Sequence, residues 1–175
     1  TNYAAANDIN IIGDIPFYVD KDSVDVWSHP EIFKLGKDLT PTLVAGVPPD
    51  IFSSSGQLWG NLIYNWDYLK AVDYGWWKER ILHNACLYDV IRVDHFRAFA
   101  DYYCIPAGAK DATGGFWQKG VGIDFWGKII PKLGGTEIIA EDLGGEDSPL
   151  VIKLLKQTGF PNMKVLQFAF DSDEQ

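Results

Sequence analysis

The chain has 175 residues, of which 47% are hydrophobic and 22% charged, proportions that exclude disordered and collagen-like proteins. No stretch approaches the roughly 18 consecutive apolar residues of a membrane-spanning helix, so we expect a cytoplasmic protein without a membrane partner. Fifteen Lys and Arg against 24 Asp and Glu give a formal net charge of -9, which would repel a phosphate backbone and argues against a nucleic-acid partner.

The first predicted element is a buried strand near the start of the chain. Residues 9–15 form an apolar, β-branched run that contains Asp14, a pattern typical of a parallel strand. Residues 18–68 have little periodicity but many Pro, Gly, Ser and aromatic residues, which predicts a long ordered excursion rather than a flexible linker. Residues 68–87 carry apolar residues at spacings of three and four, so we expect one helix that packs on the sheet.

A second strand is predicted over residues 90–95, directly after that helix. It carries Arg92 and Asp94 near its end. A glycine-rich excursion follows, and residues 123–133 then have the pattern of a short helix. The short junctions between helix and strand are those expected of a βαβ unit.

The last part of the chain predicts a third strand, a helix and a fourth strand. Residues 136–144 form an apolar run that includes Glu141 and Asp142 near its end. A helix is expected over residues 149–157, and a fourth strand over residues 164–170.

The order of these elements predicts the fold class. Strands alternate with helices and no hairpin signal separates them, which indicates an α/β protein with a parallel sheet and helical crossovers. In such sheets the functional groups gather at the carboxyl ends of the strands. Because acidic residues lie near the ends of the predicted strands, we expect one shared site at that edge.

Arg92 and Asp94 are the first candidate pair at this edge. Side chains alternate along a strand, so both lie on the same face. A neighbouring guanidinium lowers the pKa of a carboxyl, which suits an aspartate that acts as a nucleophile. The alternative is a structural ion pair at the end of a strand.

Glu141 ends the next predicted strand and is the second candidate carboxyl. Two carboxyl groups about 5 to 5.5 Å apart are the arrangement of a retaining glycosidase, in which one acts as nucleophile and the other as general acid and base. Asp142 points to the opposite face, so only one of these two acids is expected to reach the cavity. The alternative is an acidic run that caps the strand.

Metal-ligand types also gather at these strand ends. A metal site is the main competing interpretation, but the Arg92 guanidinium would repel a divalent ion, so we expect no metal. No phosphate-loop spacing is present, and we expect no cofactor. His95 follows Asp94, and its ring either donates to a ligand hydroxyl or satisfies a backbone carbonyl. The candidate ligands are Asp14, Asp94, His95, Glu141 and Asp142.

Seven motifs, in order, give the chain a close resemblance to the amylomaltases, also called disproportionating enzymes or 4-α-glucanotransferases, which are relatives of the α-amylases. The motifs are Gly-Asp-Ile-Pro-Phe-Tyr-Val at 13–19, Asp-Ser-Val-Asp-Val-Trp at 22–27, Ala-Gly-Val-Pro-Pro-Asp at 45–50, Gly-Gln-Leu-Trp-Gly-Asn at 56–61, Arg-Val-Asp-His-Phe-Arg at 92–97, Ala-Glu-Asp-Leu-Gly at 140–144 and Met-Lys-Val-Leu-Gln-Phe at 163–168. They cover nearly the whole chain.

The resemblance implies roles for individual residues. Asp94 corresponds to the catalytic nucleophile and Glu141 to the general acid and base, while Arg92 and His95 correspond to donors to the sugar. Further residues expected to bind maltooligosaccharides or other α-1,4-glucans are Asp14, Tyr18, Asp50, Phe52, Gln57, Trp59 and Asp142. The implied reaction is the retaining transfer of a glucan segment to the 4-hydroxyl of another glucan, without metal or cofactor.

One departure from the family pattern lies in the loop that arches over the acceptor groove. The loop reads Val-Pro-Pro-Asp-Ile-Phe at 47–52, so Ile51 replaces the usual Tyr while Phe52 remains. One sugar-stacking surface is therefore expected to be missing, which affects acceptor affinity rather than the chemistry.

The resemblance also implies a larger domain. It identifies residues 1–175 as an internal part of a (β/α)₈ TIM barrel, roughly strands three to six, incomplete at both ends, with residues 18–68 as the acceptor-loop insertion. A third essential Asp is expected on a later strand, so this piece alone is expected to be inactive. Two alternatives stay open: an α-glucan hydrolase with the same carboxyl pair, and a non-catalytic glucan-binding remnant.

Overall fold

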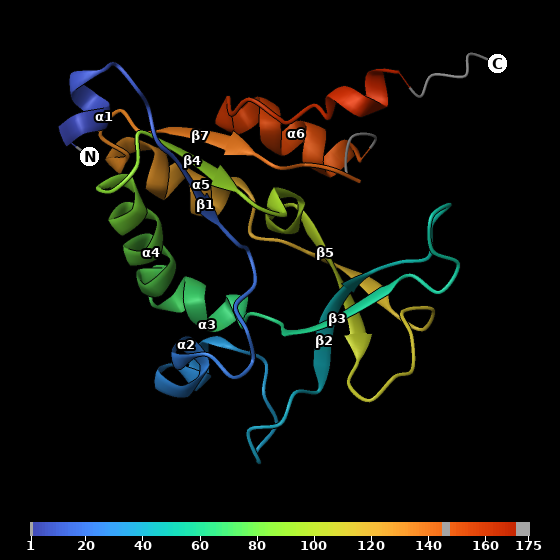
Figure 1. Cartoon of the computed structure of the whole chain (residues 1–175). Helices are drawn as coiled ribbons and strands as arrows, with labels where there is room; N and C mark the ends of the chain where they lie inside the picture. Colours follow the sequence, from blue (N-terminus) through green and yellow to red (C-terminus); the bar gives the residue numbers. More distant parts are fainter. Residues whose placement is uncertain (1, 145–147, 171–175) are drawn as a thin grey trace.

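The computed structural model describes residues 2–144 and 148–170 (Figure 1). Its strands are β1 (Ile12–Ile15), β2 (Leu43–Val47), β3 (Gln57–Leu62), β4 (Val90–Val93), β5 (Asp101–Pro106), β6 (Phe116–Lys119) and β7 (Glu137–Ala140). Its α-helices are α1 (Asn2–Ala6), α2 (Val24–Ser28), α3 (Trp66–Ala71), α4 (Gly75–Ala85), α5 (Ile123–Ile129) and α6 (Pro149–Thr158). Short 3₁₀ helices are η1 (Pro30–Ile32), η2 (Phe96–Phe99), η3 (Ile130–Lys132) and η4 (Leu166–Ala169).

Three strands form the expected parallel sheet, in the order β1-β4-β7. Helices α3 and α4 lie between β1 and β4 in the chain, and α5 lies between β4 and β7, which confirms the predicted helical crossovers (Figure 1). The register places Asp14 beside Arg92 and Val93 beside Ala140. The first residues after β4 and β7 therefore emerge side by side at the carboxyl edge.

The excursions form a second sheet, which the sequence did not predict. Strands β3-β2-β5-β6 are antiparallel, so the expectation of a purely parallel sheet without hairpins is wrong, and the fold is mixed α/β. β2 is an inner strand whose residues Val44, Ala45 and Gly46 are all buried, so it lacks the alternation of apolar and polar residues that marks a half-exposed strand.

The predicted long helix over residues 68–87 is two helices, α3 and α4. The chain breaks at Asp73 and Tyr74, which have φ angles of 54° and 56°. Tyr74 is fully buried, and its hydroxyl donates a hydrogen bond to Asp124 at 2.6 Å. The left-handed backbone costs free energy, and the burial and hydrogen bond of Tyr74 offset that cost.

The predicted fourth strand over residues 164–170 is also wrong, since η4 occupies residues Leu166–Ala169. The chain pairs with β7 at one point, a parallel bridge between Ala140 and Asn162. Beyond this bridge, the described residues up to 170 contain no strand. The backbone bonds locally instead, as in the contact from the Phe170 N–H to the Gln167 carbonyl at 3.1 Å.

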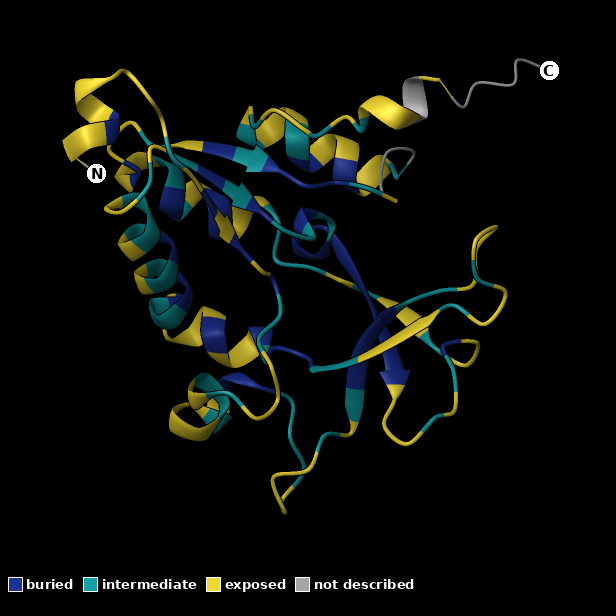
Figure 2. Cartoon of the chain, in the orientation of Figure 1, coloured by how far each residue is buried: buried dark blue, intermediate teal, exposed yellow. Residues whose placement is uncertain are grey.

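Aromatic side chains fill the core between the parallel sheet and its helices. Phe99 and Phe125 stack with centroids 5.2 Å apart, and Trp77 and Trp126 are fully buried beside them. Figure 2 shows buried residues concentrated on the strands and on the helix faces turned toward them. Burial of each such side chain contributes about 1.5–3 kcal/mol, which holds the strand ends, and thus the site, in place.

Candidate active site

The carboxyl edge of the parallel sheet brings Asp94 and Glu141 into one pocket. Each follows the last residue of its strand, and those last residues, Val93 and Ala140, are paired in the register. The Glu141 N–H also donates to the Val93 carbonyl at 3.0 Å. Both side chains line a pocket of about 590 Å³. The two predicted catalytic carboxyls therefore share a cavity.

Arg92 ties the nucleophile candidate to the neighbouring strand. Its Nη2 lies 3.0 Å from Asp94 Oδ1, and its Nη1 lies 2.8 Å and 3.0 Å from the two carboxylate oxygens of Asp14. Nε faces the Met163 sulfur at 3.1 Å. Asp14 is exposed and Asp94 is half-exposed, whereas only 26% of the Arg92 side chain is exposed. The guanidinium thus orients Asp94, and Asp14 holds the guanidinium in turn.

The backbone of His95 is strained and donates a hydrogen bond to Glu141. Its φ angle is 48°, in the left-handed region that non-glycine residues rarely adopt. This conformation directs the His95 N–H toward Glu141 Oε2 at 2.8 Å. The imidazole packs edge-on against Trp59, with centroids 4.9 Å apart. Burial, and secondarily the charge of Arg97, lowers the His95 pKa to about 4, so the ring is neutral at neutral pH.

Glu141 is the buried acid of the pair, with 8% of its surface exposed. Burial raises its pKa, and the negative charge of Asp94 raises it further. The N–H groups of His95 and Leu143 act in the opposite direction, donating to Oε2 at 2.8 Å and to Oε1 at 3.2 Å. A carboxyl that keeps its proton to higher pH and is held in place can act as a general acid.

The outer wall of the pocket comes from the loop between β2 and β3. Phe52 and Ile51 are 87% and 93% exposed and line the pocket. Asp50 also lines it and accepts hydrogen bonds from the N–H groups of Phe52 and Ser53 at 2.9 Å and 2.7 Å, which shape the turn. Large apolar side chains left in water at the mouth of a pocket indicate a ligand that stacks on them.

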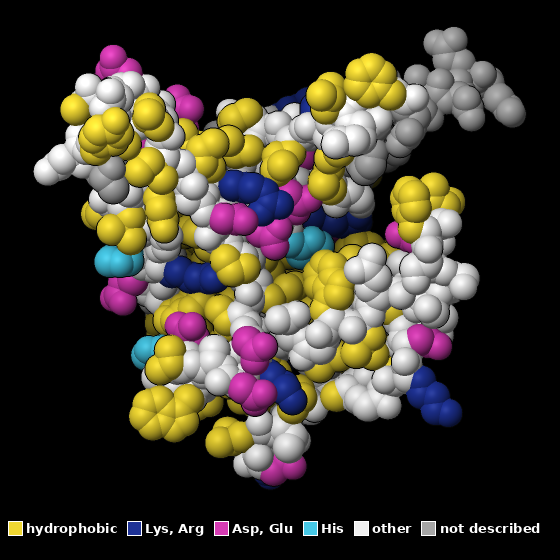
Figure 3. Space-filling view, viewed as in Figure 1, with side chains coloured by type: hydrophobic (Ala, Val, Ile, Leu, Met, Phe, Trp, Pro, Cys, Tyr) yellow, Lys and Arg dark blue, Asp and Glu magenta, His cyan; other side chains and the backbone are white. Residues whose placement is uncertain are grey.

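Two further predicted residues complete this wall. The Trp59 indole N–H donates to Gln57 Oε1 at 3.0 Å, and both side chains line the pocket. Figure 3 shows the corresponding face, where acidic, basic and histidine side chains gather beside hydrophobic ones.

Four predicted residues are absent from the pocket lining: Asp14, Tyr18, Arg92 and Asp142. Asp14 acts on Arg92, and Tyr18 packs near the rings of Trp59 and His95. Asp142 is 1% exposed and accepts from Asn162 Nδ2 at 3.0 Å, so it does not face the cavity. Strand alternation separates it from Glu141, and its predicted contact with a glucan has no support in the pocket lining.

The pocket also contains residues that sequence reasoning did not select. The most informative are Arg97, Trp117, Leu143 and Gly144. Arg97 ends the motif at 92–97, and Trp117 belongs to an aromatic pair in a glycine-rich excursion. Each of these sequence patterns could have marked its residue as a candidate for the site. Their shared location depends on the antiparallel sheet, which the sequence did not reveal.

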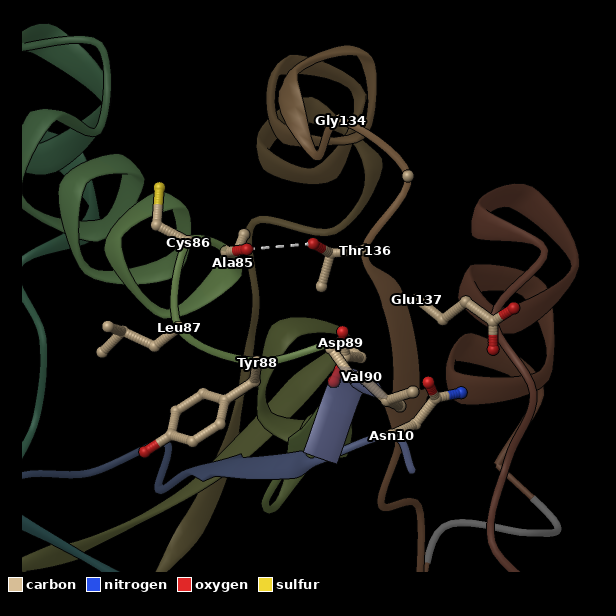
Figure 4. Close-up of a pocket in the computed structure, with 12 residues that line it drawn as sticks. Asn10, Ala85, Cys86, Leu87, Tyr88, Asp89, Val90, Gly134, Thr136 and Glu137 are labelled. Atoms are coloured by element: carbon tan, nitrogen blue, oxygen red, sulfur yellow. Dashed lines mark hydrogen bonds between the residues drawn. The ribbon is translucent and has the colours of Figure 1, made fainter. Parts of the chain in front are cut away.

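A second pocket, of about 550 Å³, lies at the amino edge of the same sheet (Figure 4). It is lined by Asp89 and Glu137 among others, and the Thr136 hydroxyl donates to the Ala85 carbonyl across it at 3.1 Å. Asp89 Oδ2 accepts from the Ile11 N–H at 2.9 Å. Its polar groups support the backbone around the start of β4.

Metal-ligand clusters and membrane-spanning helices are both absent from the described residues. In ranges 2–144 and 148–170, no three His, Cys, Asp or Glu side chains converge as a set of metal ligands. Over the same ranges, every helix is too short or too polar to cross a bilayer.

Paired carboxyl groups at strand ends, in a pocket with aromatic walls, are an arrangement found in the class of enzymes that cleave or transfer glycosidic bonds. The comparisons with known proteins identify the family within that class. The family model described as 4-alpha-glucanotransferase matches residues 1–175, and the chain belongs to this family.

Individual relatives agree with this assignment. The chain is 49% identical over 173 residues to the 4-alpha-glucanotransferase of Clostridium butyricum, covering 98% of this chain and 35% of the relative. Its structure matches the amylomaltase from Streptococcus agalactiae in complex with acarbose, with a TM-score of 0.91 and 48% identity, over 98% of this chain and 34% of the other. The amylomaltase from Corynebacterium glutamicum shares the fold, with a TM-score of 0.80 and 23% identity. The chain thus spans about a third of the length of the relatives that it matches.

Proposed function

We propose that the chain is the central part of the catalytic domain of a 4-α-glucanotransferase that acts on α-1,4-glucans. One observation carries the proposal: Asp94 and Glu141 follow register-paired residues of adjacent parallel strands and line the same pocket. Family membership and the fraction of each relative that is covered support a longer parent protein.

In the proposed first step, Asp94 Oδ attacks the anomeric carbon of a bound glucan. The C1–O4 bond breaks as the C1–Oδ bond forms, and Glu141 gives its proton to the departing 4-oxygen. Arg92 orients Asp94 through the contact at 3.0 Å. Burial raises the pKa of Glu141, which favours the protonated carboxyl that a general acid needs.

In the second step, the 4-hydroxyl of another glucan attacks the same carbon. The C1–Oδ bond breaks, and the Glu141 carboxylate takes the hydroxyl proton, so configuration at C1 is retained. Transfer instead of hydrolysis requires that a sugar, rather than water, occupies the acceptor side. The exposed Phe52 and the half-exposed Trp59 at the pocket mouth are suited to stack on that sugar.

The proposed architecture is a (β/α)₈ barrel to which β1, β4 and β7 contribute neighbouring strands. Their parallel order and helical crossovers support it. The antiparallel sheet then stands at the carboxyl edge, where the loops of such barrels build active sites. A third carboxylate from a later strand would complete the site, and a cytoplasmic location is proposed for the bacterial type of enzyme.

The test is incubation of the full-length protein with maltotriose, with the products separated by chromatography. Longer oligosaccharides formed together with glucose or maltose indicate transfer. Products no longer than the substrate indicate a hydrolase with the same carboxyl pair. No change in the substrate, with glucan binding retained, indicates a binding protein and contradicts the proposed catalysis.

A further inference from the structure

Arg97 lies where three walls of the pocket meet. It belongs to η2, three residues after Asp94, and its side chain is only 15% exposed. Its Nε donates to Asp101 Oδ1 at 2.8 Å, and its guanidinium carbon lies 4.0 Å from the centroid of the Trp117 ring. Its Nη1 donates to the backbone carbonyl of Gly144. One side chain therefore makes three different kinds of contact.

Each of these contacts joins Arg97 to a different segment of the chain. Asp101 begins β5 and Trp117 lies in β6, both in the antiparallel sheet, whereas Gly144 follows β7 in the parallel sheet. A guanidinium is planar, always charged and has five N–H donors, so it can stack on a ring while it donates in its own plane. A lysine ammonium cannot combine these contacts.

The contact between Arg97 and Gly144 lies next to Glu141, the proposed general acid. Gly144 has a φ angle of 71°, and the N–H of the preceding Leu143 donates back to Glu141 Oε1 at 3.2 Å. Residues 141–144 thus form a turn that folds over the Glu141 carboxyl. Arg97 contacts the far end of this turn through the Gly144 carbonyl.

The contact with Trp117 bears on the substrate. The indole is 41% exposed and lines the pocket, and it is supported from the side by Tyr103 at 5.2 Å, edge-on. Arg97 lies over its ring. An aromatic plane that is fixed by its neighbours and partly open to a pocket is suited to stack on a sugar ring.

We propose that Arg97 is a positioning residue that keeps the 141–144 turn closed over Glu141 and fixes Trp117 as a sugar-stacking surface. This inference rests on the proposed transferase function. Arg97 acts through these two residues and takes no part in bond breaking.

Loss of Arg97 should change the pH dependence of the reaction. The charged groups that face Glu141 are Asp94 and Arg92, with the neutral His95 beside them. Removing Arg97 frees the turn and admits water to Glu141, so the burial that raises its pKa is reduced. Because the general acid must be protonated, the alkaline limb of the kcat profile should then move to lower pH.

The experiment compares Arg97→Gln and Arg97→Lys with the wild type in the full-length protein, using maltotriose disproportionation from pH 4 to 9. We expect kcat to fall at least about tenfold in both variants, with the alkaline limb at lower pH, since a small misplacement of a reacting group is costly. Arg97→Lys keeps the positive charge but lacks the planar guanidinium. It provides a second test of the proposal if Arg97→Gln does not fold. If the alkaline limb of the kcat profile stays at the wild-type pH, or if kcat stays within about twofold of the wild type, the proposal is overturned.

Arg80→Gln is the matched control. Arg80 also lies over tryptophan rings, 5.2 Å from the Trp76 centroid and 5.0 Å from that of Trp77, but outside this pocket. We expect it to lower the melting temperature without moving the alkaline limb. If Arg80→Gln moves the limb as Arg97→Gln does, the effect is general destabilisation and the positioning role is wrong.

Trp117→Ala and Trp117→Phe separate the two parts of the proposal. We expect Trp117→Ala to raise KM for maltotriose about tenfold and Trp117→Phe to retain most of the affinity, because a smaller ring still stacks. Equal KM values for both variants and the wild type overturn the stacking role. A wild-type protein that performs no transfer instead contradicts the proposed function itself, which distinguishes the two failures.

Discussion

The two edges of the parallel sheet carry the same kinds of residue and yet differ in their chemistry. At the amino edge, Asp89 precedes β4 and Glu137 begins β7. At the carboxyl edge, Asp94 follows β4 and Glu141 follows β7. Both edges open into pockets of similar size, about 550 Å³ and 590 Å³.

The difference lies in how the acids are held. Asp89 and Glu137 are exposed, and none of the described residues that line their pocket is a lysine or arginine. At the carboxyl edge Glu141 is buried and faces a second carboxyl that is paired with a guanidinium. Burial and pairing, rather than the presence of acids, therefore distinguish the proposed active site from the amino edge.

The largest expected effect comes from Asp94→Asn. The amide cannot form the covalent bond with the sugar, so we expect kcat on maltotriose to fall at least about 10³-fold. Asp89→Asn is the matched change at the other end of the same strand, and we expect activity within about twofold of the wild type. Steady-state kinetics of the full-length variants checks both. Comparable losses in the two variants would contradict the distinction between the edges.

Glu141→Gln should have the next largest effect and should depend on the leaving group. We expect a loss of about 10²–10⁴-fold on maltotriose, because the leaving oxygen is no longer protonated. A maltosyl fluoride donor needs no such proton, so the glycosyl adduct on Asp94 should still form and be detected by intact-protein mass spectrometry. Glu137→Gln is the control and should behave as the wild type. If the rate falls equally with maltotriose and with maltosyl fluoride, Glu141 is not the general acid.

Phe52→Ala tests the outer wall of the pocket and should have a smaller effect. The side chain is 87% exposed, so its loss should not alter the fold. We expect an increase of about five- to tenfold in KM for the acceptor, with little change in the formation of the glycosyl intermediate. Trp27→Ala, an 83% exposed aromatic outside the pocket, is the control. The same rise in KM for both would point to a non-specific effect.

The smallest expected effect is on stability as a function of pH. The Glu141 pKa is raised in the folded state, so its contribution to stability is fully present below the ordinary carboxyl pKa and is lost as the pH rises through the raised value. The melting temperature of Glu141→Gln relative to the wild type should therefore be higher at pH 8 than at pH 4. Glu137→Gln, at an exposed site, should show a weaker dependence. A difference that is constant with pH would contradict the burial of the charge.

Local sequence patterns determined the three parallel strands, the crossovers and the positions of the acids. Short apolar, β-branched segments predicted β1, β4 and β7, and in the structure the residues of these strands alternate between buried and more exposed positions. The alternation of side chains also separated Glu141 from Asp142. These properties depend on a few consecutive residues.

Tertiary structure alone decided the antiparallel sheet, the break at Tyr74 and the contacts of Arg97. β2 lacks the alternating pattern of a half-exposed strand because distant segments bury both of its faces. The Tyr74 hydroxyl donates its hydrogen bond to Asp124, which is fifty residues away in the chain. Arg97 contacts residues from three separate segments. Such contacts join residues that are far apart in the chain, and no local pattern of apolar and polar residues records which distant groups meet.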